Sequence, residues 1–172
     1  MQKLHHMDER PKWLPEWTPI DKTVEILSWL FIIAMWGIVG TNFFSLPDTI
    51  PTHFNVEGKV DGYGGKYSIL LFPLIITVVF YLLGAVSKRP WHFNFVVAPT
   101  PQNYQELYRL NIRSLRVIRL VVAVMSTYIA YAIVRGAKDG AYQLSFWALP
   151  VFVAGMIIPV IVTILKSLKL KT

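Results

Sequence analysis

The sequence predicts an all-α membrane protein, a four-transmembrane-helix bundle with a structured extracytoplasmic loop between helices 1 and 2 and an amphipathic cytoplasmic extension of helix 3. Hydrophobic residues make up 54% of the 172 residues and charged residues only 16%, whereas about a quarter of a soluble domain is charged. The charges are also clustered, and four long apolar stretches lie between the clusters. Each stretch can cross the roughly 30 Å hydrocarbon layer, which takes about 20 helical residues.

The predicted spans follow a polar tail, residues 1–23, which we expect to be cytoplasmic. This tail lacks the apolar core and the small-residue cleavage site of a signal peptide, so we expect the first span to remain as an uncleaved anchor. Residues 24–172 then form a single transmembrane domain. Its spans cover residues 26–46, 67–87, 115–134 and 144–165.

Lys and Arg residues predict the orientation of the bundle. Thirteen of the seventeen lie in the N-terminal tail, in the connection between spans two and three, or at the C-terminus. Because Lys and Arg are enriched on the cytoplasmic side, we expect both termini of this multi-pass chain in the cytoplasm. The net charge of +7 therefore indicates topology and contact with anionic lipids of the bilayer rather than nucleic acid.

The connection between spans two and three is too polar to cross a membrane and too patterned for a plain linker. Residues 91–97 are aromatic and β-prone, and we expect them to lie along the membrane surface. Thr100 and Pro101 have the pattern of a helix start, with Thr100 as the capping residue, and this helix would continue into span three.

Three arginines share one face of that helix, since they are spaced at i, i+4 and i+7: Arg109, Arg113 and Arg116. The simpler interpretation is that their side chains reach lipid phosphates and fix the topology. The alternative is a cytoplasmic basic stripe that docks an acidic regulator, and replacing all three arginines distinguishes the two.

The loop between spans one and two, residues 47–66, carries the most information. Prolines favour an extended conformation in the residues before them, so residues 50–54 are predicted to be extended. Glu57-Gly58 and Asp61-Gly62 are turn dipeptides. The loop should therefore fold back compactly and bring four polar side chains together: Asp48, His53, Asn55 and Asp61.

This loop resembles family 1648 of the domains of unknown function (DUF1648), which includes the N-terminal part of SdpI-like membrane proteins. The matching loop residues are Ile50, Pro51, His53, Phe54, Asn55, Gly58, Asp61, Gly62, Gly64 and Lys66. A second similar segment follows span two and contains His92, Phe93, Asn94, Phe95, Thr100, Pro101, Asn103, Tyr104 and Tyr108. Together the two segments place the resemblance over residues 25–125.

The resemblance implies a bacterial inner (cytoplasmic) membrane protein. SdpI-like proteins give immunity to a secreted peptide toxin and relay its presence by sequestering a repressor at the membrane. The chain departs from that pattern, because residues 126–172 lack the second block of SdpI-like proteins and their additional helices. Immunity and signalling are therefore expectations at the level of the family.

A metal site or an enzyme would depend on His53, the only histidine on the predicted outer side, since His5, His6 and His92 are predicted inside. Zinc sites use three or four ligands, and the chain has no cysteine. His53 beside an aspartate has the composition of a general base, but no nucleophile stands in a recognisable setting. We therefore expect no metal, no cofactor and no catalytic residue.

The leading prediction is a non-enzymatic, SdpI-like protein that senses, or gives immunity to, an external peptide or envelope stress. The alternative is an accessory subunit of a larger membrane complex, and the second alternative is an enzyme or metal-binding protein that uses the His53 loop. In each case His53 and Asn55 can instead be structural and bond loop carbonyls. The candidate ligand or structural residues are Pro51, His53, Phe54, Asn55, Gly58, Asp61, Gly62 and Lys66.

Overall fold

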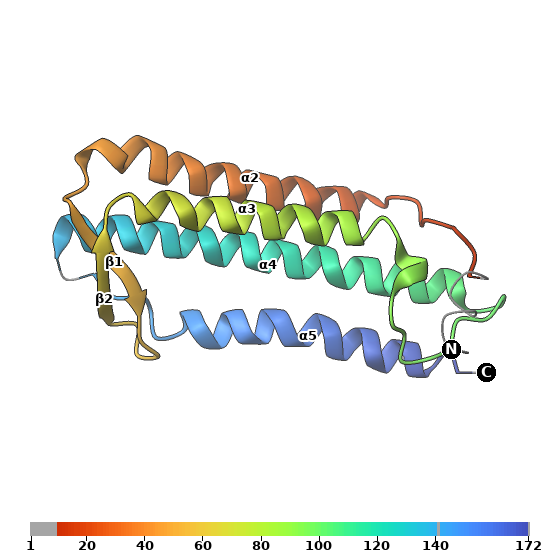
Figure 1. Ribbon diagram of the computed structural model, residues 1–172. Coiled ribbons are helices and arrows are strands. Elements are labelled where there is room, and N and C mark those ends of the chain that lie inside the picture. The colour runs from red at the N-terminus through yellow and green to blue at the C-terminus, as the bar shows by residue number, and fades with distance from the viewer. Residues whose placement is uncertain (1–9, 141, 172) are drawn as a thin grey trace, which may run out of the picture.

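Four long helices run side by side in the computed structural model, which describes residues 10–140 and 142–171 (Figure 1). Within these residues, four helices are long and apolar enough to cross a membrane, so the predicted fold class is confirmed. His5 and His6 lie outside the described residues. The helices are α2 (Pro19–Asn42), α3 (Ser68–Val86), α4 (Tyr104–Asp139) and α5 (Ala148–Leu168), and two short 3-10 turns are η1 (Phe43–Ser45) and η2 (Pro90–His92).

Helix α2 begins seven residues before the predicted span because its first turn is capped. The Asp21 amide donates to Thr18 Oγ1 at 3.3 Å, and the Thr18 amide donates to Asp21 Oδ2 at 3.0 Å. This reciprocal capping box satisfies amides that otherwise lack partners at a helix start. Hydropathy detects only the apolar stretch that follows the last charged residue, Glu25. The predicted span, residues 26–46, therefore leaves out the polar first turns of α2.

Helix α4 is continuous over 36 residues, which confirms that the polar extension runs into span three. Its predicted start was wrong: the helix begins at Tyr104, and the Thr100 hydroxyl makes no hydrogen bond among the described residues. Instead, Asn103 Oδ1 accepts from the Thr100 amide at 2.7 Å, which holds residues 101–103 in a separate turn. The helix ends at Gly140, whose φ of 70° is the left-handed conformation of a helix C-cap.

The loop between α2 and α3 forms a β-hairpin, with β1 (Thr49–Phe54) antiparallel to β2 (Val60–Gly65). The extended segment and the turn at Glu57-Gly58 are confirmed. The turn at Asp61-Gly62 was wrong, because Gly62 lies in β2 opposite His53. A Cβ on Gly62 would lie 2.9 Å from the Cβ of His53, so this glycine permits a close approach of the strands rather than a change of direction.

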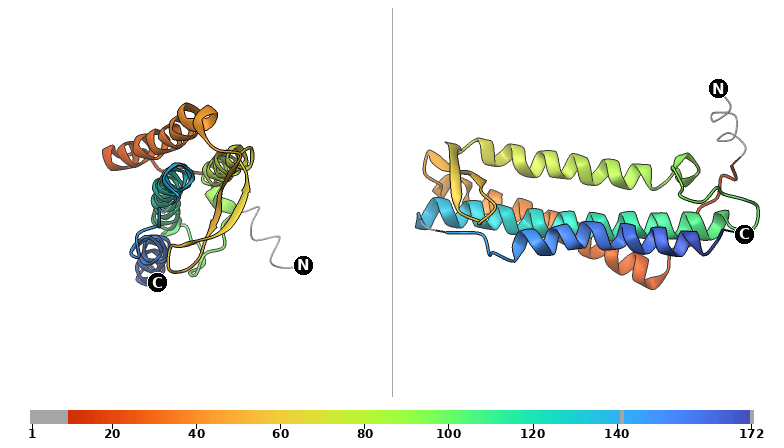
Figure 2. Two further views of the ribbon diagram at one scale, coloured as in Figure 1. Left: turned by 90° about the vertical axis from the view of Figure 1, so that its left-hand side faces the viewer. Right: turned by 90° about the horizontal axis from the view of Figure 1, so that it is seen from below.

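Helix α4 is the centre of the bundle, with α2, α3 and α5 packed around it (Figure 2). In the most apolar stretch of α4, 39% of the residues are buried, whereas in that of α5 only 6% of the residues are buried. Thr127 of α4 donates from Oγ1 to the Phe31 carbonyl of α2 at 2.8 Å. Side chains of α2, α3, α4 and the hairpin form one core, which includes Met35, Val39, Ile50, Ile69, Phe80, Ala130 and Ile133.

A second cluster closes the end of the bundle opposite the hairpin. Residues 91–97, predicted to be β-prone, form η2 and an irregular segment that packs on the first turns of α4. The Phe95 ring stacks on the fully buried Tyr108 ring at 5.5 Å between centroids. Arg10 donates to the carbonyls of Trp91 and Phe93, and Asn103 donates to the Leu170 carbonyl. The first and last described segments therefore meet at this end.

Candidate functional site

The tip of the hairpin is fixed to the connection between α4 and α5. The Leu144 amide donates to the Gly58 carbonyl at 2.9 Å. Gly58 has a φ of 82°, and a Cβ there would lie 2.4 Å from the Leu144 carbonyl oxygen. Both the left-handed backbone and the contact exclude a side chain. Gly58 therefore holds the tip of the hairpin across the bundle, toward the start of α5.

The four polar side chains that were expected to converge form separate contacts. His53 Nδ1 contacts Asp61 Oδ1 across the two strands. Asn55 Oδ1 accepts from the amides of Glu57 and Lys59 at 3.0 and 2.9 Å, so it stabilises the turn. Asp48 lies at the base of the hairpin, 3.3 Å from Lys66 Nζ. Only His53 and Asp61 are brought together.

The apolar residues of β1 attach the hairpin to α4. Ile50 is 1% exposed, and Pro51 is buried against Gly136 of α4, where a Cβ would lie 3.1 Å from Pro51 Cγ. Phe54 is half-buried against the core. These contacts place one surface of the hairpin over the bundle and leave the other surface exposed.

An apolar cavity of about 520 Å³ lies beneath the hairpin tip, between α3, α4 and α5. Its roof is formed by residues 52–56 and Gly58, and its opposite end by Phe146, Leu149 and Phe152. Helices α3 and α4 supply Phe72, Ile76, Val122, Met125, Ser126, Ile129 and Ile133 to the wall, and Leu144, Ser145 and Ala148 complete the lining. His53 and Asn55 are the most polar members of the lining, and they lie at the roof.

The His53–Asp61 pair has the composition of a general base, but both side chains are largely open. The His53 side chain is 70% exposed and that of Asp61 is 45% exposed. Over the described ranges, no group of three or more His, Cys, Asp and Glu side chains lies close enough to hold a metal ion. The geometry of the hairpin is that of a lid over an apolar cavity.

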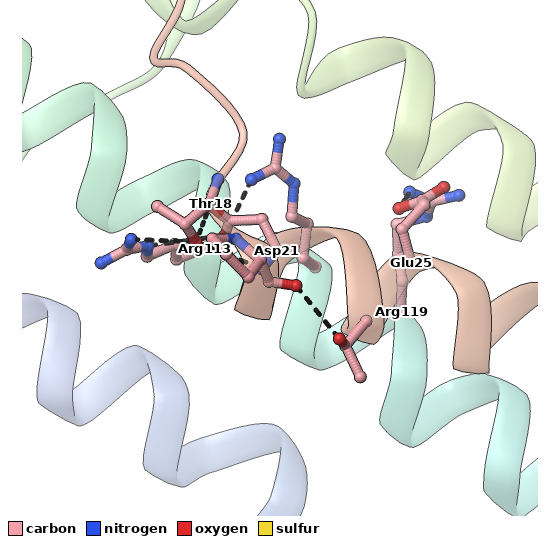
Figure 3. A network of polar contacts seen from close by, with 8 residues as sticks. Thr18, Asp21, Glu25, Arg113 and Arg119 are labelled. Carbon is pink, nitrogen blue, oxygen red and sulfur yellow. Dashed lines mark hydrogen bonds and ion pairs between the residues drawn. The ribbon is translucent and has the colours of Figure 1, made fainter.

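At the opposite end of the bundle, α2 and α4 are joined by buried ion pairs (Figure 3). Arg116 Nη1 lies 2.9 Å from Asp21 Oδ1, and Arg113 Nε lies 3.4 Å from the same oxygen. One turn further along, Arg119 Nη1 donates to Glu25 Oε2 at 2.7 Å. The side chains of Arg116 and Arg119 are only 8% and 6% exposed.

These contacts change the interpretation of the predicted basic stripe. Arg116 is buried against α2, and its guanidinium lies 3.9 Å from the centroid of the Trp17 ring. Arg113 also faces Asp21, although its side chain is 44% exposed. Arg109 pairs with Glu106 within α4. The three arginines are therefore bound largely by acids of the same chain rather than forming a free row.

Sequence reasoning missed the contacts between two acids of α2, Asp21 and Glu25, and the arginines of α4, and it gave no role to Arg119. Asp21 and Glu25 are spaced at i and i+4 on α2, while Arg116 and Arg119 are spaced at i and i+3 on α4. Both pairs lie near the starts of two helices that run in the same direction. The two acids share one face of α2 and the two arginines share one face of α4, because residues at these spacings lie on the same side of a helix. Comparing acids and arginines at a similar distance from the start of each apolar stretch would have identified the contact.

The comparisons with known proteins bear on the first half of this arrangement. The family model described as "Domain of unknown function (DUF1648)" matches residues 30–77, which confirms the resemblance predicted from the first loop. The matched segment contains most of α2, the whole hairpin and the first half of α3. The second segment of the predicted resemblance, from His92 to Tyr108, lies outside the match.

A protein of Archaeoglobus fulgidus, described as "Uncharacterized protein", is similar to the chain. It is 25% identical over 71 residues, which is 41% of this chain and 39% of the relative. The chain therefore matches about two fifths of the length of that relative. No solved structure matches the chain.

Proposed function

We propose, from the DUF1648 match at residues 30–77 and the cavity beneath the hairpin, that this membrane protein is a non-enzymatic, SdpI-like receptor for an external hydrophobic peptide. It gives immunity to the peptide or reports its presence. The observation that supports this function is the apolar cavity with a hairpin roof. Binding sites for small ligands are commonly apolar concavities with a few polar groups that fix orientation.

The cavity suits an apolar side-chain cluster of a peptide better than a polar substrate. Its wall is formed mostly by aliphatic and aromatic residues of three helices, and its most polar side chains, His53 and Asn55, lie at the roof. An amphipathic peptide inserts apolar residues into such a groove, while its backbone and charged groups remain at the surface. The loop 47–66 carries three acids against two lysines, and this small excess of negative charge would attract a cationic peptide.

Helix α4 provides the physical connection between the cavity and the opposite end of the bundle. Met125, Ile129 and Ile133 line the cavity, and the same helix carries the ion pairs of Arg116 and Arg119 with α2. A peptide that favours one packing of α4 would therefore shift the arrangement of the other end, provided that its affinity for the two packings differs.

Helix α5 is the element best suited to move when the cavity is occupied. It packs on α4, and a second apolar cavity of about 550 Å³ lies along the α4–α5 contact, lined by Val121, Tyr128, Trp147 and Gly155 among others. The two cavities share Met125, Ser145, Ala148 and Phe152. An element bordered by two cavities has few packing contacts to lose when it shifts.

The test uses two neighbouring isoleucines of α3. Ile76 lines the cavity, whereas Ile75 is 58% exposed on the outer surface of the bundle and does not line it. The full chain, Ile76→Trp and Ile75→Trp are each expressed in a bacterial host that lacks the gene, and the hosts are challenged with a panel of membrane-active cationic peptides. We expect the full chain and Ile75→Trp to raise the inhibitory concentration of at least one peptide, and Ile76→Trp to lose that protection.

A second cavity variant, Leu149→Trp on α5, separates loss of binding from loss of folding, because Leu149 lines the cavity yet is 45% exposed. Membrane levels of every variant are measured on the same samples. Equal protection by cavity variants and Ile75→Trp would contradict the proposal, as would the absence of any protection by the full chain.

A non-enzymatic role also predicts that His53→Ala keeps part of the protection, because His53 is one polar member of a mostly apolar lining. The imidazole is an exposed partner of Asp61, and exposed ion pairs contribute at most about 1 kcal/mol. An enzyme that used His53 as a general base would lose about 100-fold or more of its rate. Complete loss of protection in His53→Ala, with normal membrane levels, would favour the enzyme alternative.

A further inference from the structure

A third cavity, of about 270 Å³, lies at the opposite end of the bundle from the hairpin, between α2 and α3. We infer that it binds the phosphate of an anionic membrane lipid. Its floor is formed by Arg116 and Arg119 of α4, and Lys88 lies at its edge on the α3 side. Figure 2 shows that α2 diverges from α3 toward this end, where the cavity lies.

Arg119 is the central group of this site. Its Nη1 atom is bound to Glu25, but its Nε atom, although buried, has no hydrogen-bond partner among the described residues. The guanidinium lies 4.0 Å from the centroid of the Phe80 ring. A buried N–H group without a partner is unfavourable, and an anion in the cavity would satisfy it after a small shift of the side chain.

Gly84 of α3 makes room for this guanidinium. A Cβ at position 84 would lie 3.1 Å from both Cζ and Nη2 of Arg119. The absence of a side chain there lets the charged group lie directly against the backbone of α3, beside the cavity. The site is therefore shaped by three helices rather than by a flexible surface side chain.

The charge balance of the cavity favours an anion. Three cations line it, Lys88, Arg116 and Arg119, against one carboxylate, Glu25. Asp21 lies behind Arg116 and offsets part of its charge. One cation remains in excess even when Asp21 is counted, and Lys88 is exposed, with no ion pair among the described residues.

The surroundings identify the source of the phosphate as a lipid. The rim carries Trp17, Trp29 and Tyr81, which are 49%, 40% and 65% exposed. Such amphipathic rings favour the depth of lipid headgroups. Ile26 and Leu82, which follow the lining residues Glu25 and Tyr81 in the sequence, are also more than half exposed, which suits acyl chains. Basic pockets between transmembrane helices are a known setting for the headgroups of anionic lipids.

The experiment compares Lys88→Gln with Lys166→Gln in the purified full chain. Both substitutions remove one exposed lysine at the same end of the bundle, but Lys166 lies on α5 and outside the cavity. The retained lipid is measured by native mass spectrometry after equilibration with phosphatidylglycerol or with zwitterionic phosphatidylcholine. Both variants lose the same general attraction to an anionic surface, so a difference between them reports the cavity.

We expect the unmodified chain to retain phosphatidylglycerol in preference to phosphatidylcholine. Lys88→Gln should weaken this retention about fivefold more than Lys166→Gln does, because only Lys88 lines the cavity and would add a direct contact with the headgroup, worth about one Lys–headgroup interaction. Ala85→Leu, which adds bulk to the cavity lining without changing a charge, should weaken it as well. Inorganic phosphate alone should not raise the melting temperature of the detergent-solubilised chain.

Three results would overturn the inference. Equal retention by Lys88→Gln and Lys166→Gln would mean that lipid is held by surface charge in general. Equal retention of the two lipids would mean that no anionic group is recognised. Stabilisation by inorganic phosphate equal to that by phosphatidylglycerol would assign the site to a soluble anion.

Discussion

Individual glycines decide how closely the elements of this protein approach each other. Gly58 meets the Leu144 carbonyl, Gly84 meets the Arg119 guanidinium, and Gly155 of α5 lies where a Cβ would be 2.9 Å from Val121. Each contact joins segments that are distant in the sequence. Gly58 differs from the other two because its backbone also has a positive φ, so that position has two reasons to exclude a side chain.

Gly58→Ala is therefore expected to destabilise the attachment of the hairpin. An alanine in the left-handed conformation, with an added clash against Leu144, should cost about 1–3 kcal/mol. Gly65→Ala is the matched control at the other end of β2, because a Cβ there meets nothing within 4 Å. Limited proteolysis of the hairpin and thermal unfolding in detergent measure the effect. Equal behaviour of the two variants would contradict the role given to Gly58.

At the scale of elements, the packing of α2 on α4 combines apolar contacts with ion pairs. The core residues Met35 and Val39 of α2 are fully buried, and Asp21 and Glu25 extend the contact toward the end of the bundle. Buried charges lose solvation that a partner must replace. The ion pairs therefore select one register of α2 against α4, since a shift would leave Arg116 and Arg119 buried without carboxylates.

This account predicts a difference between single and double substitutions. Arg119→Leu leaves the Glu25 carboxylate, which is 20% exposed, beside an apolar side chain, and should destabilise the protein by about 3–5 kcal/mol. The double variant Glu25→Leu/Arg119→Leu should recover most of this loss, because no unpaired charge remains. Thermal unfolding in detergent gives the comparison.

Arg135→Leu is the control for that experiment. Arg135 pairs with Asp139 within α4, but both side chains are more than 40% exposed, so the pair should contribute about 0.3–0.5 kcal/mol. If the double variant is less stable than Arg119→Leu alone, the buried pair does not act as described.

At the scale of the whole molecule, α4 joins two sites of different chemistry. One is the apolar cavity beneath the hairpin, and the other is the cavity lined by arginines near the chain ends. The two lie at opposite ends of a helix of 36 residues, which at about 1.5 Å per residue is long enough to cross the bilayer. A ligand on one side and a lipid on the other would then act on the same helix.

The predicted orientation is open to a direct test because the chain has no cysteine. Val56→Cys places a thiol at the hairpin tip, where Val56 is 80% exposed, and Gln102→Cys places one at the other end. A membrane-impermeant maleimide applied to intact cells should label Val56→Cys only. Inverted membrane vesicles should give the reverse pattern, and labelling of Gln102→Cys in intact cells would show that the positive-inside assignment is wrong.

The sequence alone determined the number of helices, the position of the hairpin loop and the continuity of α4, because each depends on local hydropathy and on local backbone preferences. It also indicated Glu57-Gly58 as a turn, since glycine readily adopts the left-handed conformation. The helix starts at Pro19 and Tyr104 were placed poorly, because the capping box of Thr18 and the turn that Asn103 holds at Thr100 depend on geometry that hydropathy does not contain.

Only the tertiary structure decided which side chains meet. Asp61 and His53 face each other because of the strand register, whereas Asn55 and Asp48 turn to the backbone and to Lys66. Arg116 and Arg119 are buried against acids about 95 residues earlier in the chain. Such partners are fixed by the crossing of α2 and α4, which brings together faces that no local pattern in the sequence relates.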